Sequence, residues 1–215
     1  MLTLALACFL AAPLGWLARR VAAKLATAPP PGPAAMIAAA GVMTVGVLTL
    51  RPAFAPAGLL LGWGLLTLAA VDLGDLRLPN ILTLPWIGMG LLLAALNLSQ
   101  GTPPKFDRAA LEAHGLGAAG GYLAFAGLAA AYRLLRGREG LGLGDAKLAA
   151  VAGAWLGWRI LPAVVLVACG LSLLWIGIRF ARQGRDALNA PLPFGPPLAA
   201  AVWLGWISPT VLGAA

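Results

Sequence analysis

The sequence predicts an all-α, polytopic membrane protein with about eight transmembrane helices. Of its 215 residues, 61% are hydrophobic and only 10% are charged, and the mean hydropathy is +0.90. The hydrophobic share and the mean hydropathy lie far above those of a soluble domain, and the charged share lies far below. A helix needs about 20 mainly apolar residues to cross the hydrocarbon core, and runs approaching that length recur along the chain. We expect one integral-membrane domain over residues 1–215, because no stretch between the runs is long enough for a soluble domain.

Eight apolar runs mark the expected helices, and they cover residues 2–17, 34–50, 57–71, 81–98, 116–135, 146–156, 160–178 and 197–212. A proline-rich connection separates the first two runs, and prolines also precede the fourth and the eighth. Charged segments follow the third, fifth and seventh. The sixth run is short and begins beside Asp145 and Lys147, so it requires tilting, a thinned bilayer or burial among its neighbours.

The basic residues predict how the helices are oriented. With eight helices, one side of the membrane receives Arg19, Arg20, Lys24, Arg77, Arg133, Arg136, Arg138, Lys147, Arg179, Arg182 and Arg185. The other side receives only Arg51, Lys105, Arg108 and Arg159. Short loops rich in Lys and Arg remain in the cytoplasm, so the larger group marks the cytoplasmic face and both termini lie outside. The net charge of +8 therefore reports topology. It does not indicate a nucleic-acid interface, because the basic residues form no single patch with interleaved aromatics.

Several less common residues are expected to have only structural roles. Cys8 and Cys169 fall inside predicted helices, so we expect neither a disulfide framework nor a metal site. His114 ends the longest polar stretch, residues 101–114, where we expect a solvated side chain. Tryptophans near segment ends are interpreted as interfacial anchors, at positions 16, 63, 86, 155, 158, 175, 203 and 206. Solvation in loops is a sufficient account of four carboxylates, Asp107, Glu112, Glu139 and Asp186.

Two of the remaining carboxylates lie at membrane boundaries. Asp72 directly follows the third apolar run, and Asp145 directly precedes the sixth. On the predicted topology both reach the cytoplasmic face, so they can meet at one depth. An ionisable group at the bilayer edge is costly and is by default interpreted as functional. If the two carboxylates approach closely they share about one proton, and one can then activate water while the other protonates the leaving amine.

A structural interpretation competes with this one at about even weight. Asp72 and Asp75 could pair with Arg77, and Asp145 with Lys147, as interfacial ion pairs. The residues around Asp145 favour the catalytic interpretation. They read Gly140-Leu141-Gly142-Leu143-Gly144-Asp145, and such small residues permit unusual backbone angles, close helix approach and room for an extended substrate.

Three motifs resemble those of the type IV prepilin peptidases, the bacterial branch of the membrane aspartyl proteases known for a Gly-x-Gly-Asp motif. Gly142-Leu143-Gly144-Asp145 matches that motif, and Lys147-Leu148 continues it. Asp72 stands several residues before Pro79-Asn80, as the other family aspartate does before its own Pro-Asn or Pro-Asp pair. Pro193-Phe194-Gly195-Pro196 is similar to a third family segment. The order and spread of the three motifs make coincidence improbable.

The resemblance implies that Asp72 and Asp145 are the catalytic pair of an aspartic endopeptidase. Asp75 does not occupy the matching position and is expected in the cytoplasmic loop. Supporting or substrate-binding roles are implied for Gly142, Gly144, Lys147, Pro79, Asn80, Pro193, Phe194, Gly195 and Pro196. Lys147 could steer substrate, or it could simply snorkel to the interface. The segment from Pro193 to Pro196 could border the cleft or form a rigid turn ahead of the last helix.

The implied partners are prepilins or pseudopilins of type IV pilus, type II secretion or tight-adherence systems, together with membrane lipid. Their basic leaders would be cut at the cytoplasmic face of the bacterial inner membrane. Longer family members also methylate the cut pilin, and they carry two Cys-x-x-Cys pairs after the first helix. The equivalent loop here, residues 18–33, contains no cysteine. The resemblance therefore implies no zinc and no other cofactor, and it speaks against methyltransferase activity.

Two other functions are compatible with the same residues. A small transporter could use Asp72 and Asp145 as a proton or cation relay, although no convincing inverted repeat is seen. A catalytically silent assembly factor could retain the fold, but the presence of both aspartates argues against it.

Overall fold

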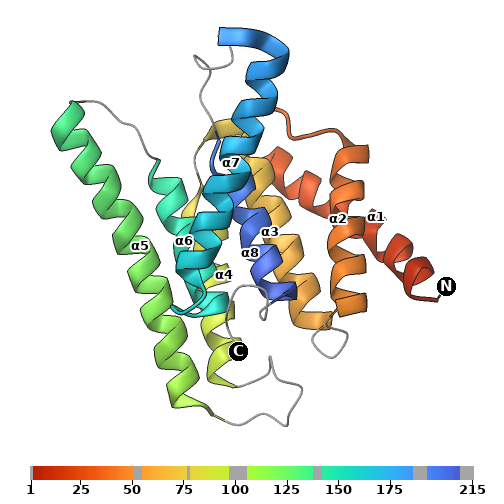
Figure 1. The fold of residues 1–215 in the computed structure, drawn as a ribbon. Helices are drawn as coiled ribbons and strands as arrows, with labels where there is room; N and C mark the ends of the chain where they lie inside the picture. Colours follow the sequence, from red (N-terminus) through yellow and green to blue (C-terminus); the bar gives the residue numbers. More distant parts are fainter. Residues whose placement is uncertain are drawn as a thin grey trace.

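The computed structural model describes residues 2–50, 55–76, 78–96, 106–137, 142–185 and 193–208. Within these ranges the chain is helical and contains no strand. Eight helices follow one another (Figure 1): α1 (Leu2–Leu25), α2 (Pro33–Leu50), α3 (Ala55–Asp75), α4 (Asn80–Ala95), α5 (Arg108–Arg136), α6 (Leu143–Leu156), α7 (Leu161–Gln183) and α8 (Gly195–Ile207). The all-α, polytopic fold predicted from the sequence is confirmed.

Four of the helices, α2, α3, α5 and α7, are long and apolar enough to cross a membrane, and α4 and α8 are shorter apolar helices. Three helices, α3, α6 and α8, make up the centre of the bundle. α3 packs against α1, α2 and α8, and α6 packs against α4, α5 and α8. Burial among neighbours is therefore how the short α6 is accommodated, since all of its residues except Leu143 and Lys147 are buried.

Two helices extend well beyond the apolar runs that predict them. α1 continues through Arg19, Arg20 and Lys24 to Leu25, and Ala18 and Ala22 in this extension are completely buried. α5 begins eight residues earlier than expected, at Arg108. Its N-cap is Asp107, whose side chain accepts a hydrogen bond from Ala110 N at 2.9 Å. The expectation that Asp107 is simply solvated is wrong, because its oxygen satisfies a free amide of the first turn.

The prediction of a solvated loop histidine is also wrong. His114 lies within α5, and its Nδ1 is 2.9 Å from the carbonyl oxygen of Ala154 on α6. The two helices are in unusually close contact there, because a methyl group placed on Gly117 would lie 2.7 Å from the carbonyl oxygen of Gly153. Small residues on both helices let the backbones approach. Gly117 thus serves packing inside the chain, and it fixes α5 against the helix that carries Asp145.

The tryptophans do not all act as interfacial anchors. Trp86, Trp155, Trp203 and Trp206 are buried in the core. Edge-to-face contacts join Trp63 to Trp86 at 5.6 Å, Trp86 to Trp155 at 6.5 Å and Trp155 to Trp206 at 5.7 Å between ring centroids. Trp155 Nε1 also donates to the Trp86 carbonyl oxygen at 2.8 Å. This chain of rings connects α3, α4, α6 and α8. Among the tryptophans, only Trp16 and Trp158 are exposed.

Candidate active site

Asp72 lies in the last turn of α3 and is almost completely buried, with 3% of its surface exposed. Its Oδ2 accepts a hydrogen bond of 3.0 Å from the backbone N–H of Gly195, the first residue of α8. A side chain at position 195 would overlap this carboxylate, since an added Cβ would lie 2.6 Å from Asp72 Cγ. The third sequence motif is thus in direct contact with the first predicted aspartate.

Asp145 lies in the first turn of α6 and is 8% exposed. α6 begins after Gly142, whose φ of −74° and ψ of 139° are extended. The Asp145 N–H donates to the Gly142 carbonyl oxygen at 3.1 Å. The carboxylates of Asp145 and Asp72 are near enough to interact electrostatically. The fold therefore brings together two buried acidic side chains that are 73 positions apart in the sequence.

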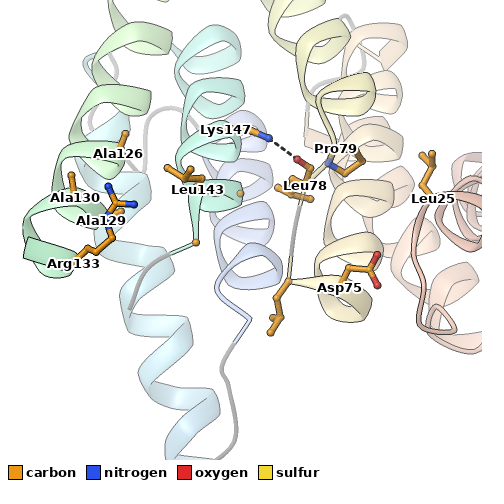
Figure 2. Close-up of a pocket in the computed structure, with 13 residues that line it drawn as sticks. Leu25, Asp75, Leu78, Pro79, Ala126, Ala129, Ala130, Arg133, Leu143 and Lys147 are labelled. Carbon is orange, nitrogen blue, oxygen red and sulfur yellow. Dashed lines mark hydrogen bonds between the residues drawn. The ribbon is translucent and has the colours of Figure 1, made fainter. Parts of the chain in front are cut away.

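The connection between α3 and α4 packs against the start of α6. Lys147 Nζ donates to the Leu78 carbonyl oxygen at 2.9 Å, the contact that is dashed in Figure 2. A methyl group on Gly144 would lie 3.3 Å from Leu78 N, and one on Gly142 would lie 3.8 Å from the Leu76 carbonyl oxygen. Close approach therefore explains Gly144, whereas a methyl group on Gly142 would make only an ordinary van der Waals contact. The expected unusual backbone angles explain neither glycine, because Gly142 and Gly144 are absent from the described residues with positive φ.

A cavity of about 650 Å³ opens beside this contact, and Figure 2 shows the helices around it. One wall comes from the end of α5, with Ala126, Ala129, Ala130 and Arg133, and the opposite wall from Leu25 of α1 and Asp75 of α3. The floor between them is formed by Leu76, Leu78, Pro79, Gly142, Leu143, Gly144 and Lys147. Four predicted supporting residues, Gly142, Gly144, Lys147 and Pro79, thus line one cavity.

The other predicted supporting residues lie elsewhere. Asn80 is the exposed first residue of α4, next to the cavity-lining Pro79 that caps the helix. Pro193, Phe194, Gly195 and Pro196 do not line the cavity. Phe194 instead packs on Phe125 of α5, with ring centroids 6.1 Å apart, and Gly195 contacts Asp72. Sequence reasoning did not find Leu78, Leu76 or Arg133, because nothing in an aliphatic or basic residue distinguishes a cavity wall from a lipid-facing helix.

Asp75 has a different environment from the two buried aspartates. Its carboxylate accepts hydrogen bonds from Thr27 N at 2.9 Å, Thr27 Oγ1 at 2.5 Å and Ala28 N at 3.3 Å. It is the last residue of α3 rather than a loop residue. These bonds fasten the end of α3 to the connection between α1 and α2. Arg77, the partner that the ion-pair interpretation requires, lies outside the described residues.

The chemistry available here is that of carboxylates and backbone amides. Within the described ranges, no group of three or more His, Cys, Asp or Glu side chains is placed to hold a metal ion. The Lys147 ammonium is directed to the Leu78 carbonyl, and the only ion pair found among the described residues joins Arg108 to Glu112 on the surface of α5.

Comparison with known proteins agrees with the resemblance carried by the first two motifs. The sequence model of the type IV leader peptidase family matches residues 59–178, a range that contains Asp72 and Asp145. The prepilin leader peptidase/N-methyltransferase of Aeromonas salmonicida is 41% identical over 162 residues, covering 74% of this chain and 52% of the relative. Proteins of the same name from Burkholderia pseudomallei and Stutzerimonas stutzeri are 41% and 37% identical, covering 75% and 70% of this chain and 50% and 48% of their own lengths.

The chain thus spans about half the length of the curated relatives that it matches. No solved structure matches it. The family match extends over more than half of the 215 residues, and it includes both buried aspartates of the candidate site. On these grounds the chain belongs to the type IV leader peptidase family.

Proposed function

We propose that this chain is a membrane-embedded aspartic endopeptidase that removes the basic leader from type IV prepilins or pseudopilins. The observation that carries the proposal is the meeting of Asp72 and Asp145, two buried and interacting carboxylates on separate helices. Family membership and the names of the relatives, prepilin leader peptidase/N-methyltransferase, supply the substrate class.

The reaction follows from placing two carboxylates together in a site of low exposure. Like charges at short range oppose double ionisation, so the pair holds about one proton. The ionised member accepts a proton from water as the water oxygen attacks the scissile carbonyl carbon. The protonated member then gives its proton to the leaving amine as the C–N bond breaks. No step requires a metal or a cofactor.

The cavity offers a place for the leader beside the start of α6, although neither Asp72 nor Asp145 lines it. A helical peptide hides its carbonyls in intrahelical hydrogen bonds, so the segment around the cut must unwind locally. Gly142 and Gly144 line this cavity, and Asp145 directly follows Gly144 in the chain. We further propose that this end of the bundle faces the cytoplasm, where a basic leader resides; the grouping of the basic residues supports this orientation.

The proposal is tested by cleavage of a synthetic prepilin with a basic leader and a glycine before the cut, in detergent. Wild type is expected to cut, whereas Asp72→Asn and Asp145→Asn fold normally and have no activity. Glu112→Gln is the control, because Glu112 is an exposed carboxylate in an ion pair on α5. An inactive wild type, or full activity in either Asn variant, would refute the dyad. A relay that transports protons or cations would then be the function to examine, with uptake into proteoliposomes under an imposed gradient.

The methyl transfer named in the longer relatives is not included in the proposal. The connection between α1 and α2, residues 26–32, contains no cysteine and is occupied by its bonds to Asp75. We propose one peptidase domain over residues 1–215 with a single type of activity. Incubation of the cut pilin with a methyl donor, followed by mass spectrometry of the new amino terminus, is expected to show no added methyl group.

A further inference from the structure

The start of α8 presents one free backbone N–H to the dyad, and Asp72 takes it. In the first turn of a helix the amides have no partner within the helix and favour negative charge. Here the second and third helical residues are Pro196 and Pro197, which have no N–H, and Leu198 N already donates to the Phe194 carbonyl oxygen. Gly195 N–H is thus the single amide left, and it lies 3.0 Å from Asp72 Oδ2.

The environment of Asp145 differs in this respect. Among the described residues, no donor forms a hydrogen bond with its carboxylate. It benefits from the start of α6, whose dipole favours negative charge, whereas Asp72 lies at the unfavourable end of α3. A direct hydrogen bond to an ionised group outweighs the diffuse effect of a helix end. The direct bond from Gly195 therefore decides which of the two carboxylates is better prepared to be ionised.

Building on the proposed function, we propose that Asp72 is the ionised carboxylate that activates water, that Asp145 is the protonated acid, and that Gly195 is the positioning residue that fixes this order. Gly195 fulfils two requirements at once. Its N–H holds Asp72 Oδ2, and its lack of a side chain is what allows the contact, because a Cβ would overlap the carboxylate. The second Asp72 oxygen is left for water.

The assignment gives a balanced reaction. Asp72 takes one proton from water while the water oxygen bonds to the scissile carbonyl carbon, whose π electron pair moves to the carbonyl oxygen. When that pair returns, the C–N bond breaks, and its electrons take the proton of Asp145 on nitrogen. The products are a carboxylic acid and an amine. The dyad keeps one proton, now on Asp72, and its return to Asp145 restores the starting state.

The test uses a prepilin peptide in which a hydroxyethylene group replaces the scissile bond, so that one hydroxyl must donate to the ionised carboxylate and accept from the protonated one. Asparagine is neutral and offers N–H groups, so it imitates a protonated aspartate. Asp145→Asn is therefore expected to bind the peptide within about threefold of wild type by calorimetry. Asp72→Asn is expected to bind it at least tenfold more weakly. Equal affinities of the two variants, or the reverse order, would overturn the assignment.

A second arm separates the role of Gly195 from a general role in folding. Gly195→Ala is expected to weaken peptide binding at least tenfold in the Asp145→Asn background and to change it little in the Asp72→Ala background, where the side chain that Gly195 holds, and that an added Cβ would overlap, is absent. A merely structural effect would be equal in both backgrounds and would overturn the role of Gly195. Gly120→Ala is the control, because a methyl there meets open space.

Cleavage of the parent peptide by wild type is measured alongside. If it is absent, the proposed function and the assignment both fail, whereas cleavage together with equal affinities refutes the assignment alone.

Discussion

Replacing Lys147 by methionine should disconnect the two segments that carry the aspartates. Lys147 follows Asp145 by two residues, and its Nζ donates to the carbonyl oxygen of Leu78, six residues after Asp72. Methionine keeps the apolar stem and removes the ammonium group. The sequence offered two roles for this lysine, substrate steering and snorkelling. Its contact instead makes it a tether between the start of α6 and the connection between α3 and α4.

The size of the effect follows from that single contact. A hydrogen bond to a charged donor contributes about 1.5–3 kcal/mol. The lower end applies, because Lys147 is half-buried and water can partly replace the lost donor, although Leu78 itself is only 2% exposed. If the loss of this contact disturbs the dyad enough to raise the activation free energy by about 1.4 kcal/mol, turnover falls roughly tenfold. Lys147→Met should therefore lower kcat about tenfold with little change in KM.

The assay is cleavage of the synthetic prepilin under saturating and limiting substrate, with unfolding in detergent measured in parallel. Lys147→Arg should preserve most of the activity, since it retains a donor. Lys24→Met, which removes an exposed lysine in the last turn of α1, is the matched control for loss of charge. A rise in KM with unchanged kcat would show that Lys147 acts on the substrate, and wild-type kinetics would show that the tether has no influence on the dyad.

Two further predictions concern the supports of the site. Asp75→Ala removes the acceptor for Thr27 N and Thr27 Oγ1, so the free energy of unfolding should fall by about 1.5 kcal/mol while the folded fraction still cuts; complete loss of cleavage with unchanged stability would instead place Asp75 in the reaction. Gly153→Leu places a side chain against the backbone of Gly117, and overpacking costs about 1–3 kcal/mol or more. Its unfolding midpoint should therefore drop well below that of Gly120→Leu, and equal midpoints would show that α5 and α6 do not need this close contact.

The sequence predicts the helices well where hydrophobicity determines them, and less well at their ends. The apolar runs locate all eight helices because each must bury its polar backbone in hydrogen bonds inside a bilayer. They do not locate the ends of α1 and α5, because a helix continues past the apolar region wherever charged residues remain helix formers. The first turn of α5 had a readable signal in Asp107, a good N-cap residue. The burial of Trp86, Trp155 and Trp206 had none, since tryptophan suits both an interface and a core.

The residues of the candidate site were predictable by type and motif, but their contacts were not. Asp72 and Asp145 attract notice because a carboxylate at a membrane boundary is costly. The partners of these residues depend on how helices pack. Leu78, which binds Lys147, contributes a backbone carbonyl that any residue type would offer, and Thr27 binds Asp75 partly through its backbone N–H. Backbone partners leave no trace in a sequence.

The connection between α3 and α4 explains why three distant motifs form one site. Leu78 and Pro79 follow the end of α3, shortly after Asp72. The Leu78 carbonyl oxygen accepts the hydrogen bond from Lys147, and Gly144 packs closely against Leu78. On the other side of Asp72, Gly195 fixes the carboxylate through its N–H. The first motif is therefore held from two directions, by the second motif 69 positions away and by the third 123 positions away. Movement of either α6 or α8 changes the setting of Asp72, so the geometry of the dyad depends on the packing of three central helices and not on any one of them.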